Sequence, residues 1–173
     1  SEEKTKNETD KIKTRTKKTI EEKLGDDPYA KKVFSALLKA AIEKAESMFD
    51  YKAQFKLFSD LEAKVEEREV PDLPLEAFSG NKHAQAYYGT FKLVLGYDFA
   101  VLEKDKGEQL IEEAFEMNTV VNRAVAENSL NPVGIEQDVR KHLLPQLFSL
   151  VGLDKAKAIL DEVVQILRNG VTK

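Results

Sequence analysis

Apolar residues recur at every third or fourth position along most of the chain, which is the spacing of one face of an α-helix. Residues 4–24 are almost all charged or Thr, with three apolar residues among them. This pattern predicts a first helix with a thin apolar stripe. That stripe consists of Ile12, Ile20 and Leu24. Gly25 is expected to end this helix, and the Asp27–Pro28 pair predicts the N-cap and the first position of a second helix.

The second and third helices are predicted to have broader apolar faces than the first. The second is expected to bury one face, formed by Val33, Leu37, Ala40, Ala41, Ala45 and Met48. The third is expected to begin near Asp50 and to end in the charged residues 66–69, three of which are glutamates. Its apolar side chains are Tyr51, Phe55, Phe58, Leu61 and Val65. These three helices make up a predicted N-terminal helical part, residues 1–69.

Residues 70–80 are the clearest linker in the chain. They contain Pro71, Pro74 and Gly80, and proline cannot continue a helix because it lacks the amide N–H and clashes with the preceding turn. The linker leads to a C-terminal helical part, residues 81–173. We expect the two parts to form one helical domain together.

The C-terminal part predicts further helices, the first two at residues 81–96 and 103–128. Asn131–Pro132 repeats the N-cap and first-position signal, and Pro145 is expected to kink or break the helix that follows. A last helix is expected at residues 154–170, with its final glycine as the stop. No strand-like alternation of polar and apolar residues is present. The predicted fold class is therefore all-α: an irregular bundle of about six to seven helices.

Composition is typical of a folded protein without disulfides. Of the 173 residues, 42% are hydrophobic and 34% are charged, and none is cysteine, which excludes disulfides and thiolate metal sites. The apolar runs are too short to span a membrane, and the N-terminus lacks the apolar core of a signal peptide. We therefore expect a cytoplasmic protein with no membrane partner. Because the sequence lacks an initiator Met, we also expect it to be a fragment of a larger protein.

The motifs that hold cofactors or activate nucleophiles are absent from the sequence: GxGxxG, GxxxxGK[ST], GxSxG and HExxH. The two histidines, His83 and His142, have no second ligand at metal spacing, and His142 is expected to be a partly buried structural residue. The acidic clusters at residues 66–69 and 112–116 are interpreted as solvated helix faces. We therefore predict no catalytic, cofactor-binding or metal-binding residue, and no enzyme activity, for this fragment.

A basic strip on the first predicted helix is the candidate for DNA contact. It comprises Lys4, Lys11, Lys13, Arg15 and Lys18, three of which repeat every seven residues. Acidic residues interleave with them, so the alternative is a solvated helix stabilised by pairs of opposite charge. The net charge of −4 is unusual for a domain that binds DNA through phosphates, although it leaves room for a local basic strip.

Four large apolar side chains are candidates for contact with a partner protein. They are Phe55, Leu57, Phe78 and Phe99. Phe78 lies in the predicted linker and Phe99 lies between predicted helices. Such side chains are often buried in protein interfaces, and the alternative is a place in the core of this chain.

Five segments carry a further pattern: Asp26–Phe49, Ala86–Leu93, Asn128–Pro132, Ile135–Pro145 and Gly152–Lys157. The last two read IEQDVRKHLLP and GLDKAK. Together the segments resemble the C-terminal helical region of type I restriction enzyme R subunits, and the resemblance covers most of the chain in register.

The resemblance implies a larger parent protein with a nuclease domain and two ATP-driven motor domains that use ATP and Mg²⁺. None of the family's nuclease or ATPase motifs occurs in this chain, so no catalytic residue or cofactor is carried over. For this region the resemblance implies packing on the parent's motor domains and docking to the methyltransferase and specificity subunits, with DNA contacted indirectly. The alternative is a helical domain that binds DNA directly or serves as a general protein-interaction module.

Overall fold

The structure is a computed structural model that describes residues 1–171, and within them it contains eight helices and no strand. The predicted all-α class is therefore confirmed. The chain divides into two compact units. Unit 1 comprises Ser1–Gly25 and Ala30–Leu73, and unit 2 comprises Asp26–Tyr29 and the chain from Pro74 onward. The division after Leu73 lies within the stretch that the prolines mark in the sequence.

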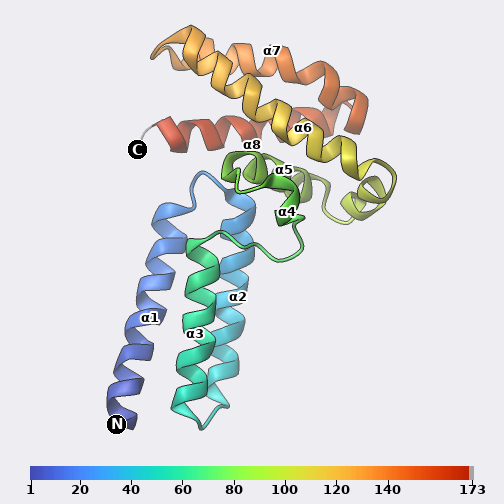
Figure 1. Ribbon diagram of the computed structural model, residues 1–173. Helices are drawn as coiled ribbons and strands as arrows, with labels where there is room; N and C mark the ends of the chain where they lie inside the picture. Colours follow the sequence, from blue (N-terminus) through green and yellow to red (C-terminus); the bar gives the residue numbers. More distant parts are fainter. Residues whose placement is uncertain (172–173) are drawn as a thin grey trace. The chain divides into compact units, whose positions relative to one another are not determined.

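Unit 1 consists of three long helices that run side by side (Figure 1). They are α1 (Glu2–Lys23), α2 (Pro28–Glu46) and α3 (Tyr51–Glu66), and the first two residues of α2 belong to unit 2. The predicted start of the third helix is confirmed, because the Asp50 side chain accepts hydrogen bonds from the first backbone N–H groups of α3.

α1 and α3 pack closely against each other along a stripe that mixes threonine with isoleucine. The buried residues of α1 are Thr9, Ile12, Thr16 and Ile20. A threonine that donates its hydroxyl to its own helix can be buried, and Thr9 does so with the carbonyl of Thr5 at 2.8 Å. The sequence pattern did not indicate the two threonines because it counted only apolar residues.

α2 buries a different face from the one predicted. Its buried side chains are Ala30, Phe34, Leu38, Ala41 and Ala45. Of the predicted face, Ala41 and Ala45 are among them, whereas Val33 and Leu37 are half-buried and Ala40 is exposed. The periodicity could not decide between the faces because α2 has two adjacent apolar stripes.

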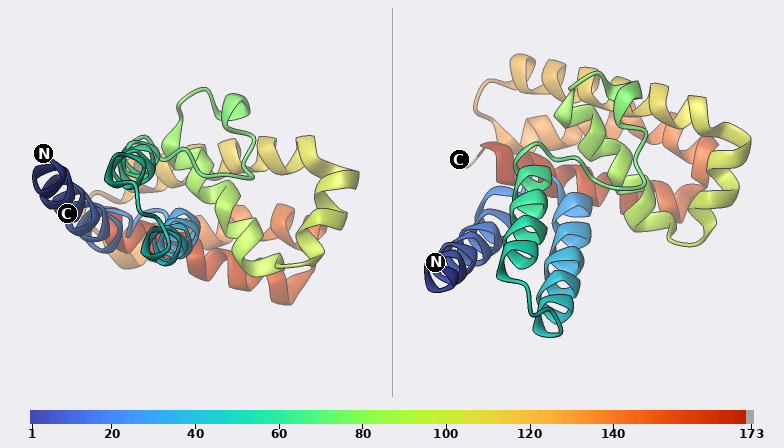
Figure 2. Two further views of the ribbon diagram at one scale, coloured as in Figure 1. Left: turned by 90° about the horizontal axis from the view of Figure 1, so that it is seen from below. Right: turned by 60° about the horizontal axis from the view of Figure 1, so that its bottom comes forward.

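In unit 2, four long helices form a closed ring in which each packs against two neighbours (Figures 1 and 2). They are α5 (Lys82–Leu95), α6 (Asp98–Asn128), α7 (Pro132–Val151) and α8 (Leu153–Val171). Contacts lead from α5 to α6, from α6 to α7, from α7 to α8 and from α8 back to α5. The short helix α4 (Leu75–Phe78) packs on α5. This ring encloses the core of unit 2.

α4 and its last residue show that the predicted linker is only partly a linker. Phe78 is fully buried, and its ring lies 5.3 Å from that of Tyr88 and 5.6 Å from that of Phe115, measured between centroids. Tyr88 in turn contacts Phe99 edge to face at 5.7 Å. These rings make an aromatic cluster, so the second half of the predicted linker belongs to the core of unit 2.

Three helix boundaries in unit 2 differ from the predicted ones. α6 begins at Asp98, five residues early, and bends at Lys106, where φ is −131° and ψ is 27°. α7 continues through Pro145 without a break, and this proline is exposed, so water can bond to the carbonyl that it leaves without a donor. Gly170 does not stop α8, which reaches Val171.

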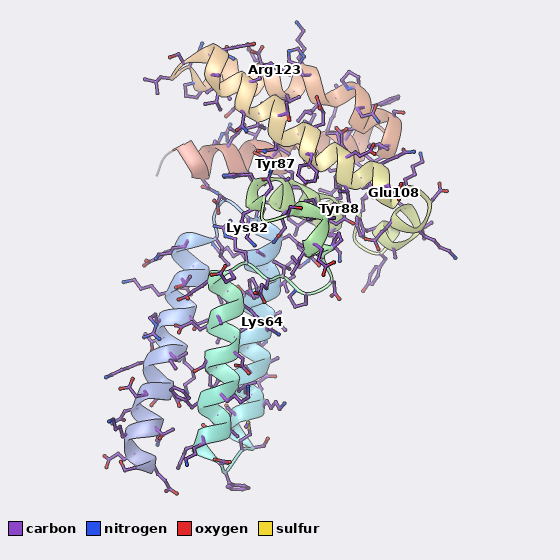
Figure 3. The ribbon with its side chains drawn as sticks, in the orientation of Figure 1. Lys64, Lys82, Tyr87, Tyr88, Glu108 and Arg123 are labelled. Carbon is purple, nitrogen blue, oxygen red and sulfur yellow. The ribbon has the colours of Figure 1, made fainter. Side chains whose placement is uncertain are left out.

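α5 is the most deeply buried helix of unit 2. All residues from 84 to 91 are buried, and Figure 3 labels two of them, Tyr87 and Tyr88. Gly89 permits a close approach by Tyr29, which also belongs to unit 2. A Cβ atom on Gly89 would lie only 2.7 Å from the Cβ of Tyr29.

We expect Gly89→Ala to lower the free energy of unfolding by about 1–3 kcal/mol, because the added methyl overlaps an atom next to the Tyr29 backbone. Urea unfolding of the full chain measures this. The control is Gly107→Ala, whose methyl would meet only Glu103 Cγ at 3.7 Å and should gain up to about 1 kcal/mol of helix propensity. Equal behaviour of the two variants would contradict the close approach.

Candidate docking surface

An apolar groove lies between α2 and α3 in unit 1, and we name it the α2–α3 groove. Its floor is lined by Leu37, Ala40, Ala41, Leu57, Leu61 and Pro71. Its rim carries Lys44, Asp60 and Lys64, and Figure 3 shows Lys64 on α3. An apolar centre with a charged rim is the usual anatomy of a protein interface.

The groove exists because unit 1 covers only one stripe of α2. α1 and α3 pack closely, whereas few Cα atoms of α2 come within 8 Å of either helix. The second stripe of α2, with Val33, Leu37 and Ala40, is therefore left half-buried or exposed. The sequence contains a signal for this second stripe, because its residues repeat at helical spacing next to the stripe of Phe34 and Leu38.

The rim of the α2–α3 groove has an excess of positive charge. Asp60 is paired with Lys56 of the same helix at 2.8 Å and so contributes no free negative charge. Lys44 and Lys64 are exposed, and neither has an ion pair within residues 1–171. The groove therefore presents two unpaired ammonium groups beside an apolar floor.

A second apolar groove lies on the other side of α2, next to α1. Ile20, Leu38 and Ile42 line it, and Ile42 is the exposed member of the three. Its rim carries two lysines and two glutamates, which are Lys17, Glu21, Lys39 and Glu43. This rim is balanced in charge, so it favours no particular sign in a partner.

The four predicted interface residues divide between surface and core. Leu57 lines the α2–α3 groove, and Phe55 is 37% exposed in a shallow hollow with Lys4 and Lys52. Phe78 and Phe99 are buried in the aromatic cluster of unit 2, so their prediction as interface residues is wrong. The sequence placed both outside a helix, and a residue outside a regular pattern can still be buried through long-range packing.

The basic strip on α1 is largely neutralised by carboxylates. Arg15 donates two hydrogen bonds to Glu62 of α3, at 2.6 and 2.8 Å, and this pairing raises the pKa of Arg15. Within α1 itself, Lys11 pairs with Glu8 at 3.3 Å and Lys13 pairs with Asp10 at 3.0 Å. Of the five predicted DNA contacts, two are exposed without an ion pair within the described residues, Lys4 and Lys18. The structure therefore favours the predicted alternative of a helix with paired charges.

No group of three or more His, Asp or Glu side chains in the described part of the chain could hold a metal ion. His83 and His142 are both exposed. The predicted partial burial of His142 is wrong, because one residue along α7 turns the side chain by about 100° away from the buried stripe of Leu143.

Glu113 on α6 is a buried carboxyl group in a cluster that was predicted to be solvated. Its neighbours Glu112 and Glu116 are exposed as predicted, but Glu113 is only 5% exposed. Its Oε1 atom has no hydrogen-bond partner within the described residues. Burial, and next the charge of Glu116, raise the pKa of Glu113 to about 7. A buried carboxylate without a hydrogen-bond partner for one oxygen destabilises the fold when it is charged.

Comparisons of the chain with known protein families, with curated proteins and with solved structures found no match. Within residues 1–171, no helix combines the length and the apolar character needed to cross a membrane. Of the two apolar grooves beside α2, the α2–α3 groove is the one that has an excess of positive charge on its rim, and it is the candidate site.

Glu113→Gln tests the buried carboxyl through stability against pH. The pKa of Glu113 is raised from 4.5 to about 7 in the folded chain. The folded chain therefore holds this proton more tightly than the unfolded chain, and the free energy of unfolding falls as pH rises from about 4.5 through about 7. We expect the variant to be more stable than the wild type at pH 8, by on the order of 2–3 kcal/mol, and similar at pH 5.

Denaturant unfolding at the two pH values measures this difference. Glu112→Gln, a substitution at the exposed neighbour, is the control and should follow the wild type at both. A Glu113→Gln variant that follows the wild type as well would show that this carboxyl is solvated.

Proposed function

We propose that the chain is a non-catalytic assembly domain of a type I restriction enzyme R subunit, which helps to join the motor domains of the enzyme to its methyltransferase core. Two separate observations support this. The segments from Asp26–Phe49 to Gly152–Lys157 resemble the C-terminal helical region of that family. The α2–α3 groove is a surface of the kind that such docking needs.

The observation that carries the proposal is the uncovered second stripe of α2. Leu37 and Leu57 are half-buried in one groove, and Ala40, which lines the same groove, is exposed. Covering such side chains removes apolar surface from water, with a gain of about 25 cal/mol for each Å² covered. Binding is therefore the contribution that we assign to this chain, whereas DNA cleavage, translocation, ATP and Mg²⁺ belong to the proposed parent protein.

We expect the chain to co-elute with the purified methyltransferase core at micromolar concentration in size-exclusion chromatography, in the absence of DNA. Contact through an apolar groove is weakened less by salt than contact through ion pairs, so the complex should persist at moderate salt. Separate elution at that concentration would contradict the proposal.

A titration with duplex DNA serves as the control in this experiment. DNA binding that falls steeply with added salt, without binding to the core, would instead support the alternative of a direct DNA-binding domain. The pairing of Arg15, Lys11 and Lys13 with carboxylates is the reason why we place this alternative second.

A further inference from the structure

We propose that the α2–α3 groove binds an amphipathic helix of the methyltransferase core in which carboxylates flank an apolar stripe. This inference rests on the proposed function and adds the chemistry of the partner segment. It is derived from the floor, the length and the charge of the groove.

The floor requires an apolar occupant that can come close to α2. Leu37 and Leu57 stand on opposite sides of the groove as half-buried side chains, and Ala40 lies exposed on the α2 side. A small lining residue such as Ala40 leaves room for an incoming side chain to approach the backbone of α2. Knobs such as Leu or Met on the partner would fit between the two leucines.

The occupant is a helix rather than an extended segment. Both walls of the groove are helices, whose backbone N–H and C=O groups bond within each helix, so neither wall offers a free edge to a strand. An extended peptide would place its own backbone groups against an apolar floor without partners, which is unfavourable. A helix satisfies its backbone internally and presents side chains alone.

The length of the groove determines how much of a helix it can hold. The lining residues extend from Leu37 to Lys44 on α2 and from Leu57 to Lys64 on α3. Seven residues of helix rise about 10.5 Å, which corresponds to about two turns. The partner stripe therefore consists of apolar residues at positions i, i+3 or i+4, and i+7.

The charge of the rim determines the flanks of the partner helix. Lys44 and Lys64 lie on opposite walls without ion pairs in the described part of the chain, and Asp60 is already bound to Lys56. A partner with Glu or Asp on both sides of its apolar stripe would pair with both lysines, whereas a basic partner would be repelled. The groove between α1 and α2 has a balanced rim, so the same argument cannot be made for it.

The test uses the full chain and a matched pair of variants on α2. Ala40→Glu places a carboxylate on the floor of the groove, and Ala36→Glu makes the same change one turn away at an exposed position that does not line the groove. We expect Ala40→Glu to weaken binding to the methyltransferase core about tenfold or more, and Ala36→Glu to leave it within about twofold. Both positions are exposed, so both variants should fold, which circular dichroism and urea unfolding check.

A second pair of variants tests the charge of the rim. The double variant Lys44→Glu with Lys64→Glu should weaken core binding about tenfold, with most of the loss disappearing at high salt. Lys32→Glu with Lys39→Glu changes the net charge equally but on other exposed positions of α2, and it should bind as the wild type does. Equal losses in both double variants would overturn the assignment of charge to this groove.

A designed peptide separates failure of this inference from failure of the proposed function. The probe is a helical peptide of about four turns with a leucine stripe flanked by Glu, and its control carries Lys at the same positions. The chain is expected to bind the Glu peptide more tightly than the Lys peptide, and Ala40→Glu should remove this difference.

Two outcomes would be decisive. If the core binds the wild type, Ala40→Glu and Ala36→Glu equally and the Glu peptide has no advantage, the groove proposal is overturned while the assembly function stands. If the core does not bind but the Glu peptide binds in the groove, the assembly function and the source of the helix are overturned while the chemistry of the groove stands.

Discussion

α2 has apolar side chains around more of its circumference than unit 1 covers, and the functional reading of the chain depends on this excess. One set of neighbouring helices can bury a single apolar stripe, whereas a helix with two stripes needs a second set to bury the other. In unit 1 the stripe of Phe34 and Leu38 is buried, and the stripe of Leu37 and Ala40 is not. The α2–α3 groove is the direct consequence of that imbalance.

α5 in unit 2 shows what happens when the second set of neighbours is present. It too is apolar around most of its circumference, but α4, α6 and α8 all pack against it. Every residue from 84 to 91 is buried as a result. The neighbours of α5 thus cover it almost completely over these residues, whereas α1 and α3 leave one stripe of α2 uncovered.

Charge pairing separates the lysines of α1 from those of the groove. The former alternate with acidic residues along one helix or face Glu62 on α3, so three of the predicted DNA contacts are paired within unit 1. Exposed pairs of this kind contribute little stability, typically under about 1 kcal/mol, but they reduce the charge available to an incoming phosphate. Lys44 and Lys64 lack such pairs, and they stand beside apolar surface rather than along an open helix. Position relative to an apolar floor, more than the number of lysines, therefore distinguishes the two surfaces.

The sequence by itself determined the helical class, the start of α3 near Asp50 and the N-cap at Asn131, because these depend on neighbours within four residues along the chain. It also contains the second apolar stripe of α2, although a single buried face was predicted for that helix. It also indicated Leu57 as a residue outside the main stripe. Only the tertiary structure decided which stripe of α2 is buried, since that choice depends on how α1 and α3 pack.

Long-range packing likewise decided the burial of three residues for which the local sequence pattern gave a wrong prediction. Phe78 and Phe99 became core because rings distant in sequence surround them, and Glu113 became buried although its neighbours in sequence are solvated. The periodicity of a sequence records which side of a helix is apolar, but burial depends on what other helices place against that side. That is the physical reason why the helices could be read from the chain, whereas the groove between two of them required the fold.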